Sequence, residues 1–412
     1  SIQLLRLCPI SCPSTQMGWQ RVGGLAVGSA VLFFVLRWLS RKRRRPQDKE
    51  CDAVRDARAS RAEPSLPAAP ASSSSSIRGD FVLLAAFDGI RGCSAALHSL
   101  GVEPHADYSS EVDSNCNRLI AAKFPRCVQL GDLRKVDRAA LERMVAEHGR
   151  HRLWLVVGGS PCQDLSRRRG PNRKGLLGKK SKLFFEFVRV VSMLMSMGVQ
   201  VAFLLENVSS MADEERDTIS ACLGVDHVEL DSALVSACHR QRYYWTNLPL
   251  APLQPCAVDI DALLDEGWYR HPKDKPFRCF VASAAWQARR GREPLGVRSA
   301  TDPEAEERAP NADEREAILG FPRGHTRLVE GGEERFAEGQ RLKLVGNSFS
   351  VQVVAHLLAP LAEHAKEGRP LELRALREDA MLLRMDRIIG GEDDEDENEN
   401  DEDWEVIWAE ED

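Results

Sequence analysis

Short apolar runs that end in polar or glycine residues recur along the chain from Asp80 onward. Stretches with helical periodicity, such as CSAALHSL and KLFFEFVRVVSMLMSM, separate these runs. Apolar strands that alternate with helices are typical of a mostly parallel sheet covered on both faces. The pattern therefore predicts an α/β fold with strands at FVLLAAF (81–87), ADYSSEV (106–112), LWLVVGG (153–159) and VAFLLENV (201–208), completed by HVELDSALV and RYYWTNL.

The same pattern divides the chain into a folded body and its flanks. Residues 46–79 are polar and rich in Ser and Pro, as in a flexible linker. The body runs over residues 80–248, is interrupted by an irregular region rich in Pro, Arg and Glu over 249–315, and resumes over 316–390. The acidic tail, residues 391–412, is expected to be disordered and solvated.

The first segment, residues 1–45, leaves two interpretations open. Its apolar run at 22–39 has nearly the length of a membrane span and is followed at once by SRKRRR. These features are typical of a signal-anchor helix with its basic end in the cytoplasm, although Arg37 and three glycines weaken that interpretation. The basic run from Arg41 to Arg45 is alternatively a nuclear import signal.

Charge and cysteine content narrow the class of protein. The formal net charge of the 412 residues is -6, but residues 392–412 hold fourteen acidic side chains and no basic one. The rest of the chain therefore carries +8, which suits a polyanionic partner. The 11 cysteines are scattered without a Cys-x-x-Cys pair. This disfavours a zinc module and a disulfide framework, fits a reducing compartment, and predicts no metal site.

Candidate chemistry gathers where the predicted strands end, which is where ligands bind in parallel sheets. Cys162 follows Pro161 in GGSPCQDLS, at the end of an apolar strand. Most cysteines are small buried hydrophobes, and a reactive thiol needs an electropositive setting that favours the thiolate. The basic residues of the loop after Cys162 are expected to supply that setting. Glu206 ends another apolar strand and is expected to share a proton with a ring nitrogen.

Three further features suggest a nucleoside cofactor. The turn FDGIRG (87–92) lacks a full G-x-G-x-x-G, which disfavours a pyrophosphate site. Glu111 ends the next strand, where an acidic residue can hold both ribose hydroxyls, and Asp132 is placed to accept from an adenine amino group. Each acid alone is more often a cap or a solvated charge. Together they suggest S-adenosylmethionine.

The motif order FDG, SEV, GGSPCQDLS, ENV, HRQRYYWTNLP, GFPRGHT and LVGNSFSV resembles that of the DNA (cytosine-5)-methyltransferases. RKGLLGKKSKLFFEF, ERDTISACL and VSACHRQRYYWTNLP look most like the animal de novo type. The resemblance covers roughly residues 80–366. It implies a class I S-adenosylmethionine-dependent methyltransferase fold, which is Rossmann-like with a seven-stranded, mostly parallel sheet. The catalytic and cofactor-binding core is then 80–248, the target-recognition region 249–315, and the returning core with its C-terminal helices 316–390.

The resemblance also implies a role for each motif residue. Cys162 adds to carbon 6 of a cytosine flipped from the duplex, while Glu206 holds its exocyclic amine and N3. Arg242 contacts the base carbonyl, and Arg240 is assigned to the same catalytic group. The implied cofactor residues are Phe87, Asp88, Gly89, Ile90, Gly92, Glu111, Val112, Asp132, Leu133, Asn347, Ser348 and Phe349. The implied DNA-binding residues are Arg167, Arg168, Arg169, Arg173 and Lys174.

Three motifs depart from the animal de novo pattern: Gln163 stands after the cysteine where Asn is usual, the first motif reads IRGC, and the last motif has Asn347 and Phe349. These departures leave the chemistry that the resemblance implies intact. Transfer RNA is the alternative substrate, although the Cys-Phe-Thr signature of that sister group is absent. A catalytically silent DNA-binding paralogue is the other alternative.

The expected partner is double-stranded DNA, and self-association into a homo-oligomer is compatible with the sequence. A nuclear location is expected. A membrane-anchored or organellar location through residues 22–39 is the alternative.

Overall fold

The structure is a computed structural model that describes residues 76–167, 173–273, 275–282, 296–376 and 381, which all belong to one compact unit. The predicted membrane anchor and import signal, nearly all of the linker and the acidic tail lie outside these residues. Within them, no single helix is long and apolar enough to cross a bilayer. Only α10 (Glu338–Gly346) and α11 (Val351–Glu367), taken together across a 44° bend, reach the length and composition of a span.

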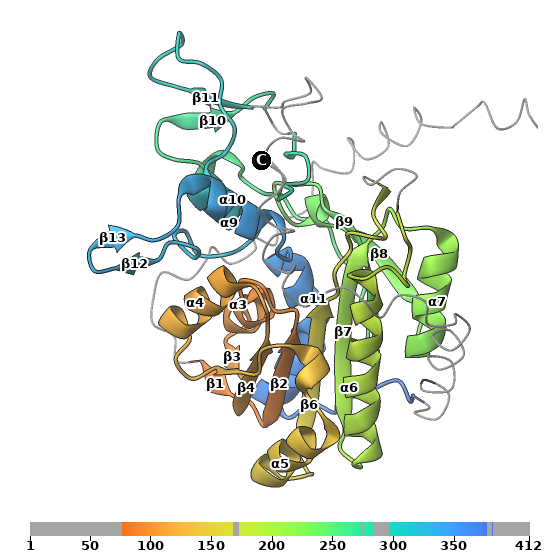
Figure 1. Cartoon of the computed structure of the whole chain (residues 1–412). Coiled ribbons are helices and arrows are strands. Elements are labelled where there is room, and N and C mark those ends of the chain that lie inside the picture. Colours follow the sequence, from red (N-terminus) through yellow and green to blue (C-terminus); the bar gives the residue numbers. More distant parts are fainter. Residues whose placement is uncertain (1–75, 168–172, 274, 283–295, 377–380, 382–412) are drawn as a thin grey trace, which may run out of the picture. The chain divides into compact units, whose positions relative to one another are not determined.

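A seven-stranded sheet forms the centre of the described body (Figure 1). The first five strands across the sheet are parallel, whereas β9 runs antiparallel to both of its neighbours. The predicted mostly parallel sheet is confirmed. The order across the sheet is β5 (Val128–Gln129), β4 (Ala106–Ser110), β2 (Phe81–Ala86), β6 (Leu153–Gly159), β7 (Val201–Val208), β9 (Gln241–Thr246) and β8 (His227–Asp231).

Both faces of the sheet are covered, which explains why its central strands are apolar throughout. In β2, Phe81, Leu83 and Ala85 enter one hydrophobic core, and the residues between them enter the other. Successive side chains of a strand point to opposite faces, so each face needs its own layer of helices. One face packs against α3 (Gly92–Ser99), α4 (Ser114–Lys123) and α11, and the other against α5 (Arg138–His148), α6 (Phe184–Ser196) and α7 (Asp213–Leu223).

Several strands end earlier than the sequence pattern predicts, since β2 ends at Ala86 and β9 at Thr246. The run ADYSSEV leaves the sheet after Ser110, so Glu111 and Val112 begin a loop. The run HVELDSALV leaves it after Asp231, whose side chain accepts hydrogen bonds from the backbone amides of Ala233 and Arg240, at 3.1 and 2.9 Å. An Asp side chain that caps the following turn ends a strand locally. The sequence pattern also did not indicate β5, which has two residues.

A smaller region follows the sheet and packs at its upper end in Figure 1. It contains an antiparallel pair, β10 (Trp268–Arg270) and β11 (Val297–Ser299). Phe277 pairs with Cys238 in an isolated parallel bridge, which attaches this region to the segment before β9. The other elements are β1 (Ile77–Arg78), β3 (Val102–Glu103), η2 (Leu133–Lys135), η4 (Ser181–Leu183), η5 (Ser232–Leu234), η6 (Asp261–Leu263), α9 (Ala312–Ile318), β12 (Val329–Glu330) and β13 (Glu333–Glu334).

The strand order places a topological switch point between β2 and β6. After β2 the chain moves to β4 on one side of the sheet, and after β5 it returns to β6 on the other side. The connections therefore diverge at the carboxyl ends of β2 and β6. Open α/β sheets bind their ligands at such a crevice. The turn FDGIRG and the loop SPCQDLS leave these two strand ends.

Candidate active site

The turn after β2 is built on left-handed backbone. Gly89 has a φ of 55°, which glycine adopts without steric cost, and Phe87 has a φ of 53°. Asp88 and Ile90 are buried, at 7% and 1% exposure. The turn thereby directs the backbone amide of Gly89 outward, toward the end of β4.

Glu111 lies beside this turn and is held by backbone amides. One carboxylate oxygen accepts from Gly89 N at 2.7 Å, and the other accepts from Val112 N at 2.7 Å and Asp113 N at 2.8 Å. Burial raises the pKa of Glu111, and these hydrogen bonds act against the rise. Val112 is 64% exposed. The fixed Glu111 carboxylate can accept hydrogen bonds from hydroxyl groups, and the exposed Val112 side chain can pack against a flat ring. These two features fit the ribose and the base of S-adenosylmethionine.

Asp132 is not joined to this turn by any hydrogen bond in the described part of the chain. Its carboxylate accepts from the backbone amide of Arg134 at 2.9 Å and pairs with the Arg134 guanidinium at 2.7 Å. Burial alone would raise the pKa of Asp132, but the bonds with Arg134 bring it below its ordinary value. Leu133 is 2% exposed and belongs to the core. The structure thus brings Glu111, but not Asp132, directly to the turn.

The last motif reaches the switch point through the Phe349 ring. A Cβ at Gly92 would come within 2.9 Å of this ring, and a Cβ at Gly159 within 2.8 Å. Both positions therefore need glycine for the ring to lie between the turn after β2 and the end of β6. Ser348 is buried and its carbonyl accepts from Arg240, whereas Asn347 is exposed at the end of α10.

The loop that carries Cys162 is fixed on both sides of the thiol. The Cys162 carbonyl accepts from the backbone amides of Leu165 and Ser166, at 3.1 and 2.9 Å. The Ser181 hydroxyl donates to the carbonyl of Pro161 at 3.0 Å. Asp164 accepts from the amides of Lys180 and Ser181, at 3.0 and 3.1 Å. Cys162 is thus held in one place at the end of β6 by residues almost twenty positions later.

Glu206 and Arg242 form an ion pair at the ends of β7 and β9. Arg242 Nε lies 2.8 Å from Glu206 Oε1, and both side chains are largely buried. Glu206 Oε1 has no hydrogen bond of good geometry, so the contact is electrostatic rather than directed. Because Glu206 pairs with Gly159 of β6 in the sheet, the ion pair lies beside the strand that carries Cys162. Three residues that the sequence placed in one site are therefore neighbours.

The electrostatic setting of Cys162 differs from the one expected from the sequence. Burial raises the pKa of its thiol, Arg242 opposes the rise, Glu206 adds to it, and Arg240 opposes it. Among the described residues, the positive charges that oppose this rise come from the start of β9 and the residue before it. Burial outweighs the effect of both arginines on the pKa of this thiol. The resting thiol holds its proton more firmly than a free cysteine does.

Arg240 joins two segments behind this pair. Its guanidinium donates to the carbonyls of Phe280 at 3.2 Å and Gly346 at 3.4 Å, and to that of Ser348. The side chain connects the smaller region with the last motif and is 4% exposed. Arg240 therefore holds the backbone of these two segments together, whereas Arg242 contacts Glu206.

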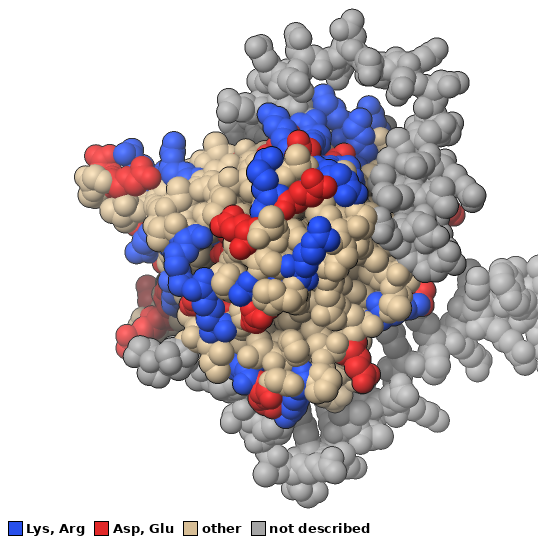
Figure 2. Space-filling view, turned by 90° about the horizontal axis from the view of Figure 1, so that it is seen from below, with Lys and Arg blue, Asp and Glu red and all other residues tan. Residues whose placement is uncertain are grey.

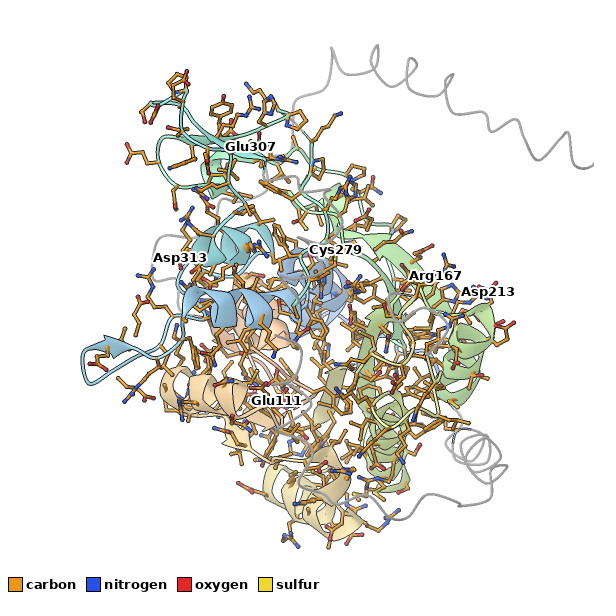
Figure 3. The ribbon with its side chains drawn as sticks, turned by 45° about the horizontal axis from the view of Figure 1, so that its top comes forward. Glu111, Arg167, Asp213, Cys279, Glu307 and Asp313 are labelled. Atoms are coloured by element: carbon orange, nitrogen blue, oxygen red, sulfur yellow. The ribbon has the colours of Figure 1, made fainter. Side chains whose placement is uncertain are left out.

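Cys279 is a component of the site that the sequence did not reveal (Figure 3). Its sulfur accepts from Arg240 Nη1 at 3.7 Å and from Arg242 Nη2 at 3.8 Å. Burial alone would raise the pKa of this thiol, but the two arginines and their hydrogen bonds bring it below its ordinary value. No spacing pattern marks Cys279, because it comes from an irregular segment that only the tertiary structure brings to β9.

The structure describes the basic loop only at Arg167, Arg173 and Lys174. The Arg167 amide donates to the Ser210 hydroxyl at 3.4 Å, and Figure 3 shows Arg167 and Glu111 well apart. Arg173 is partly exposed and Lys174 is exposed. Arg168 and Arg169 lie outside the described residues.

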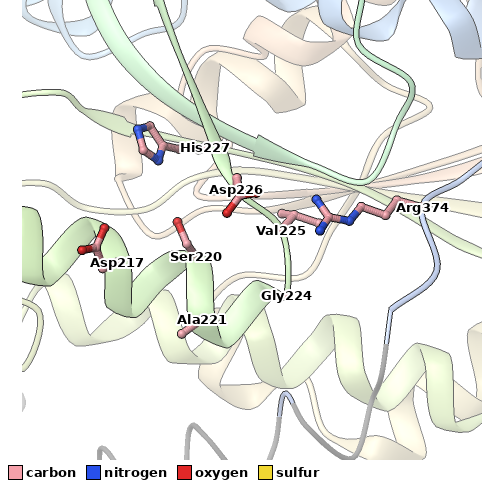
Figure 4. Close-up of a pocket in the computed structure, with 8 residues that line it drawn as sticks. All are labelled: Asp217, Ser220, Ala221, Gly224, Val225, Asp226, His227 and Arg374. Atoms are coloured by element: carbon pink, nitrogen blue, oxygen red, sulfur yellow. The ribbon is translucent and has the colours of Figure 1, made fainter.

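A separate pocket of about 490 Å³ lies between α7 and β8 (Figure 4). It contains none of the residues predicted for the site, and its lining mixes acidic and basic groups. No cluster of His, Cys, Asp and Glu able to hold a metal ion occurs in the part of the chain that the structure describes. The lining of this pocket is formed by Asp217, Ser220, Ala221, Gly224, Val225, Asp226, His227 and Arg374.

Comparison with known proteins agrees with the motif order. Residues 82–223 match the family model of the C-5 cytosine-specific DNA methylases, so the chain contains a domain of that family. DNA (cytosine-5)-methyltransferase DRM1 of Arabidopsis thaliana is 36% identical over 116 residues, which are 26% of this chain and 18% of that protein. DRM2 of Oryza sativa subsp. japonica is 31% identical over 115 residues, 26% of this chain and 19% of that protein. The predicted resemblance to the cytosine-5 methyltransferases is confirmed over residues 82–223, and plant enzymes are among the similar proteins.

The chain spans about a fifth of the length of these plant relatives. Among solved structures, the methyltransferase EhMeth of Entamoeba histolytica superposes with a TM-score of 0.49 at 18% identity, covering 70% of this chain and 99% of that one.

Proposed function

We propose that this chain transfers a methyl group to carbon 5 of cytosine in double-stranded DNA through a covalent adduct with Cys162. One observation supports this proposal above all others: Cys162, Glu206 and Arg242 meet where β6, β7 and β9 lie side by side. A buried thiol beside a carboxylate and a guanidinium is the set of groups that nucleophilic addition to a pyrimidine requires.

The residues around the turn after β2 would hold S-adenosylmethionine. Glu111 supplies the oriented carboxylate, Val112 an exposed apolar surface, and Phe349 closes the switch point from the last motif. When bound there, S-adenosylmethionine supplies the methyl group. The other predicted cofactor residues shape the turn or flank it.

The reaction begins at Cys162 in this proposal. Its thiol loses its proton, the sulfur bonds to carbon 6 of the flipped base, and the electron pair of the 5,6 double bond moves to carbon 5. Glu206 holds the exocyclic amine and N3, which makes the ring a better electrophile. Once the methyl group is on carbon 5, a base takes the proton of that carbon, the C–H electron pair restores the 5,6 double bond, and the sulfur leaves carbon 6 as a thiolate that regains a proton. Because burial holds the thiol protonated at rest, the approach of the base must assist its ionisation.

Arg242 would act on the same base as Glu206. Its Nε contacts Glu206, and its Nη2 contacts Cys279. The guanidinium is therefore held between two acceptors and is available to the base carbonyl without reorganisation, as electrostatic stabilisation requires. Arg240 supports this arrangement by joining the smaller region to the last motif.

The smaller region, 249–315, is proposed to recognise the target, because Phe280 and Cys279 bring it to the catalytic residues. Such a substrate would require the protein to reach the nucleus. The basic run 41–45 is the candidate import signal. Oligomeric state and membrane attachment remain predictions from the sequence.

The test is a transfer assay with purified full-length protein, tritiated S-adenosylmethionine, and either duplex DNA or transfer RNA. We expect label at carbon 5 of cytosine in the duplex. Transfer to transfer RNA alone would support the alternative substrate. Binding to duplex DNA without transfer to either nucleic acid would support the silent paralogue.

Replacement of Glu111 tests the cofactor site. Glu111→Ala should weaken S-adenosylmethionine binding, since each hydrogen bond with a charged partner contributes about 1.5–3 kcal/mol. Calorimetry measures the affinity directly. Glu103→Ala is the matched control, because Glu103 pairs with the exposed Arg126 at the end of β3 and should leave affinity unchanged. Equal affinities for Glu111→Ala and the parent would remove Glu111 from the site.

Replacement of the basic loop tests its binding to DNA. Removing Arg167, Arg168 and Arg169 together should flatten the salt dependence of duplex binding, by roughly 0.9 in slope for each phosphate that the variant no longer binds. Titrations of labelled duplex at several salt concentrations measure the slope. If the loop never touches DNA, mutant and parent will give parallel plots.

The control for this experiment removes the same charge elsewhere. Suitable residues for this control are Arg126, Arg138 and Arg143. Arg126 pairs with Glu103, and Arg138 contacts Ser196 near the start of β7, whereas the Cys162 loop follows the carboxyl end of β6. Figure 2 shows that the described residues on the face seen from below carry both signs of charge intermixed. Their replacement should change the slope less.

A further inference from the structure

Arg91 occupies an unusual position in the turn after β2. It is the N-cap residue of α3, has a φ of 70°, and is completely buried. Left-handed backbone is rare for residues with a side chain, and glycine is the usual choice there. A large charged residue in this conformation and at this depth needs compensating contacts.

Those contacts come from two carboxylates and one aromatic ring. Arg91 Nη1 donates to Asp88 Oδ2 at 2.6 Å, and Nη2 donates to Asp107. The guanidinium carbon lies 5.3 Å from the centre of the Phe124 ring. The guanidinium therefore bridges a residue of the turn and a residue of β4.

This bridge ties together the two segments that form the cofactor site. Asp107 is the second residue of β4, the strand whose end carries Glu111, and Asp88 precedes Gly89 in the turn. On the outer side of the turn, Gly89 N donates to Glu111. The turn is thus fastened to β4 twice, once through Arg91 inside the protein and once through Gly89 at its surface.

The Asp88 carboxylate is not accessible from the switch point. Its side chain is 2% exposed, and its carboxylate bonds to Arg91. Burial raises the pKa of Asp88, while Arg91 and the Ser109 hydroxyl lower it. A carboxylate that directly binds a ligand is expected to be accessible before the ligand arrives, as Glu111 is in part.

We infer that Arg91 is a positioning residue for the cofactor, and that Asp88 acts through Arg91 instead of touching the cofactor. The guanidinium holds the turn against β4, so that Gly89 and Glu111 keep the relative placement that binding needs. This inference rests on the proposed function, because it concerns the same S-adenosylmethionine site.

The main test is Arg91→Gly. Glycine keeps the left-handed turn without strain, so this change removes the guanidinium and spares the backbone conformation. S-adenosylmethionine should bind about tenfold more weakly or worse by calorimetry, which corresponds to about 1.4 kcal/mol. Arg91→Lys, which keeps the charge but not the fork that reaches both carboxylates, should recover part of the affinity. An affinity of Arg91→Gly equal to that of the parent, even with a lowered melting temperature, would show a merely structural role and overturn the inference.

A double-mutant cycle separates the two roles of Asp88. If Asp88 acts through Arg91, the double variant Asp88→Asn with Arg91→Gly should bind no worse than the weaker single variant. If Asp88 contacts the cofactor itself, the two losses will add, and this part of the inference fails. Should Arg91→Gly not fold, Asp107→Ala removes one arm of the bridge at a side chain that is 19% exposed. Unchanged affinity of that variant would then overturn the inference.

Amide hydrogen exchange provides a readout that needs no cofactor. The Gly89 amide is bonded to Glu111, so its peptide should exchange faster in Arg91→Gly if the bridge holds the turn. Unchanged exchange would contradict the positioning role. If the parent protein fails to bind S-adenosylmethionine while exchange in the variant still rises, the proposed function fails and the effect of Arg91 on the turn stands.

Discussion

Cys162→Ala should abolish methyl transfer while S-adenosylmethionine still binds. The thiol is the only group in the proposed mechanism that forms a bond with carbon 6, and removal of a covalent nucleophile lowers kcat on the order of 10⁴–10⁶-fold. Cofactor binding should survive, because Glu111 and the turn after β2 are not bonded to the Cys162 loop by any hydrogen bond in the described residues. Tritium transfer measures the first effect and calorimetry the second.

A trapping experiment identifies the bond itself. A duplex with 5-fluorocytosine at the target position cannot lose a proton from carbon 5 after methylation, so the adduct with the protein should persist through denaturing electrophoresis. The parent should form this adduct, and Cys162→Ala should not. Two other thiols provide controls: Cys279→Ser tests the second thiol beside Arg242, and Cys256→Ala tests a thiol in the segment that bonds to the Leu234 carbonyl. Both should still form the adduct. An adduct with Cys162→Ala would disprove the assignment.

Glu206→Gln should give the second-largest loss. The amide keeps the shape of the carboxyl but cannot hold a proton for N3, and loss of a positioned acid or base typically lowers kcat by about 10²–10⁴-fold. Affinity for S-adenosylmethionine should be unchanged, because Glu206 lies on β7 beside the catalytic thiol. It does not belong to the turn after β2, which is the proposed cofactor site. Single-turnover rates at saturating DNA and cofactor would isolate the chemical step.

The stability of this variant needs its own measurement. Arg242 is largely buried and pairs with Glu206, and a buried charge that loses its partner commonly destabilises a protein by about 3–5 kcal/mol. Denaturant unfolding should therefore accompany the kinetics. Glu186→Gln is the matched control, because Glu186 forms a comparable ion pair with Arg189 on α6. A Glu206→Gln variant that is folded and reacts at the parental rate would exclude Glu206 from the chemistry.

The fold and the location of the chemistry were largely predictable from local sequence. LWLVVGG and VAFLLENV match β6 and β7 residue for residue, because a strand buried on both faces must be apolar along its whole length. The carboxyl ends of parallel strands lie at one edge of a sheet, so residues at those ends are neighbours whatever the connecting segments do. This topological rule brought Cys162 and Glu206 into one site without any knowledge of side-chain contacts.

Strand ends that depend on caps were less predictable. Asp231 ends β8 by bonding to amides that follow it, and β5 consists of only two residues with exposed side chains. Neither feature leaves a hydrophobic period in the sequence. The pairing that makes β5 a strand comes from β4, so it depends on tertiary contacts.

The sequence by itself therefore determined the α/β class, the mostly parallel sheet, and the strand ends at which the candidate residues stand. Only the tertiary structure decided which charges surround them. Arg240, Arg242 and Cys279 meet across almost forty residues of chain, Arg91 pairs with Asp107 on a neighbouring strand, and burial raises the pKa of Cys162 despite two nearby arginines. The physical reason is that hydrophobic periodicity is a local property of the chain. Electrostatic energy and desolvation depend on distances and coverage in space, which segments remote in sequence supply.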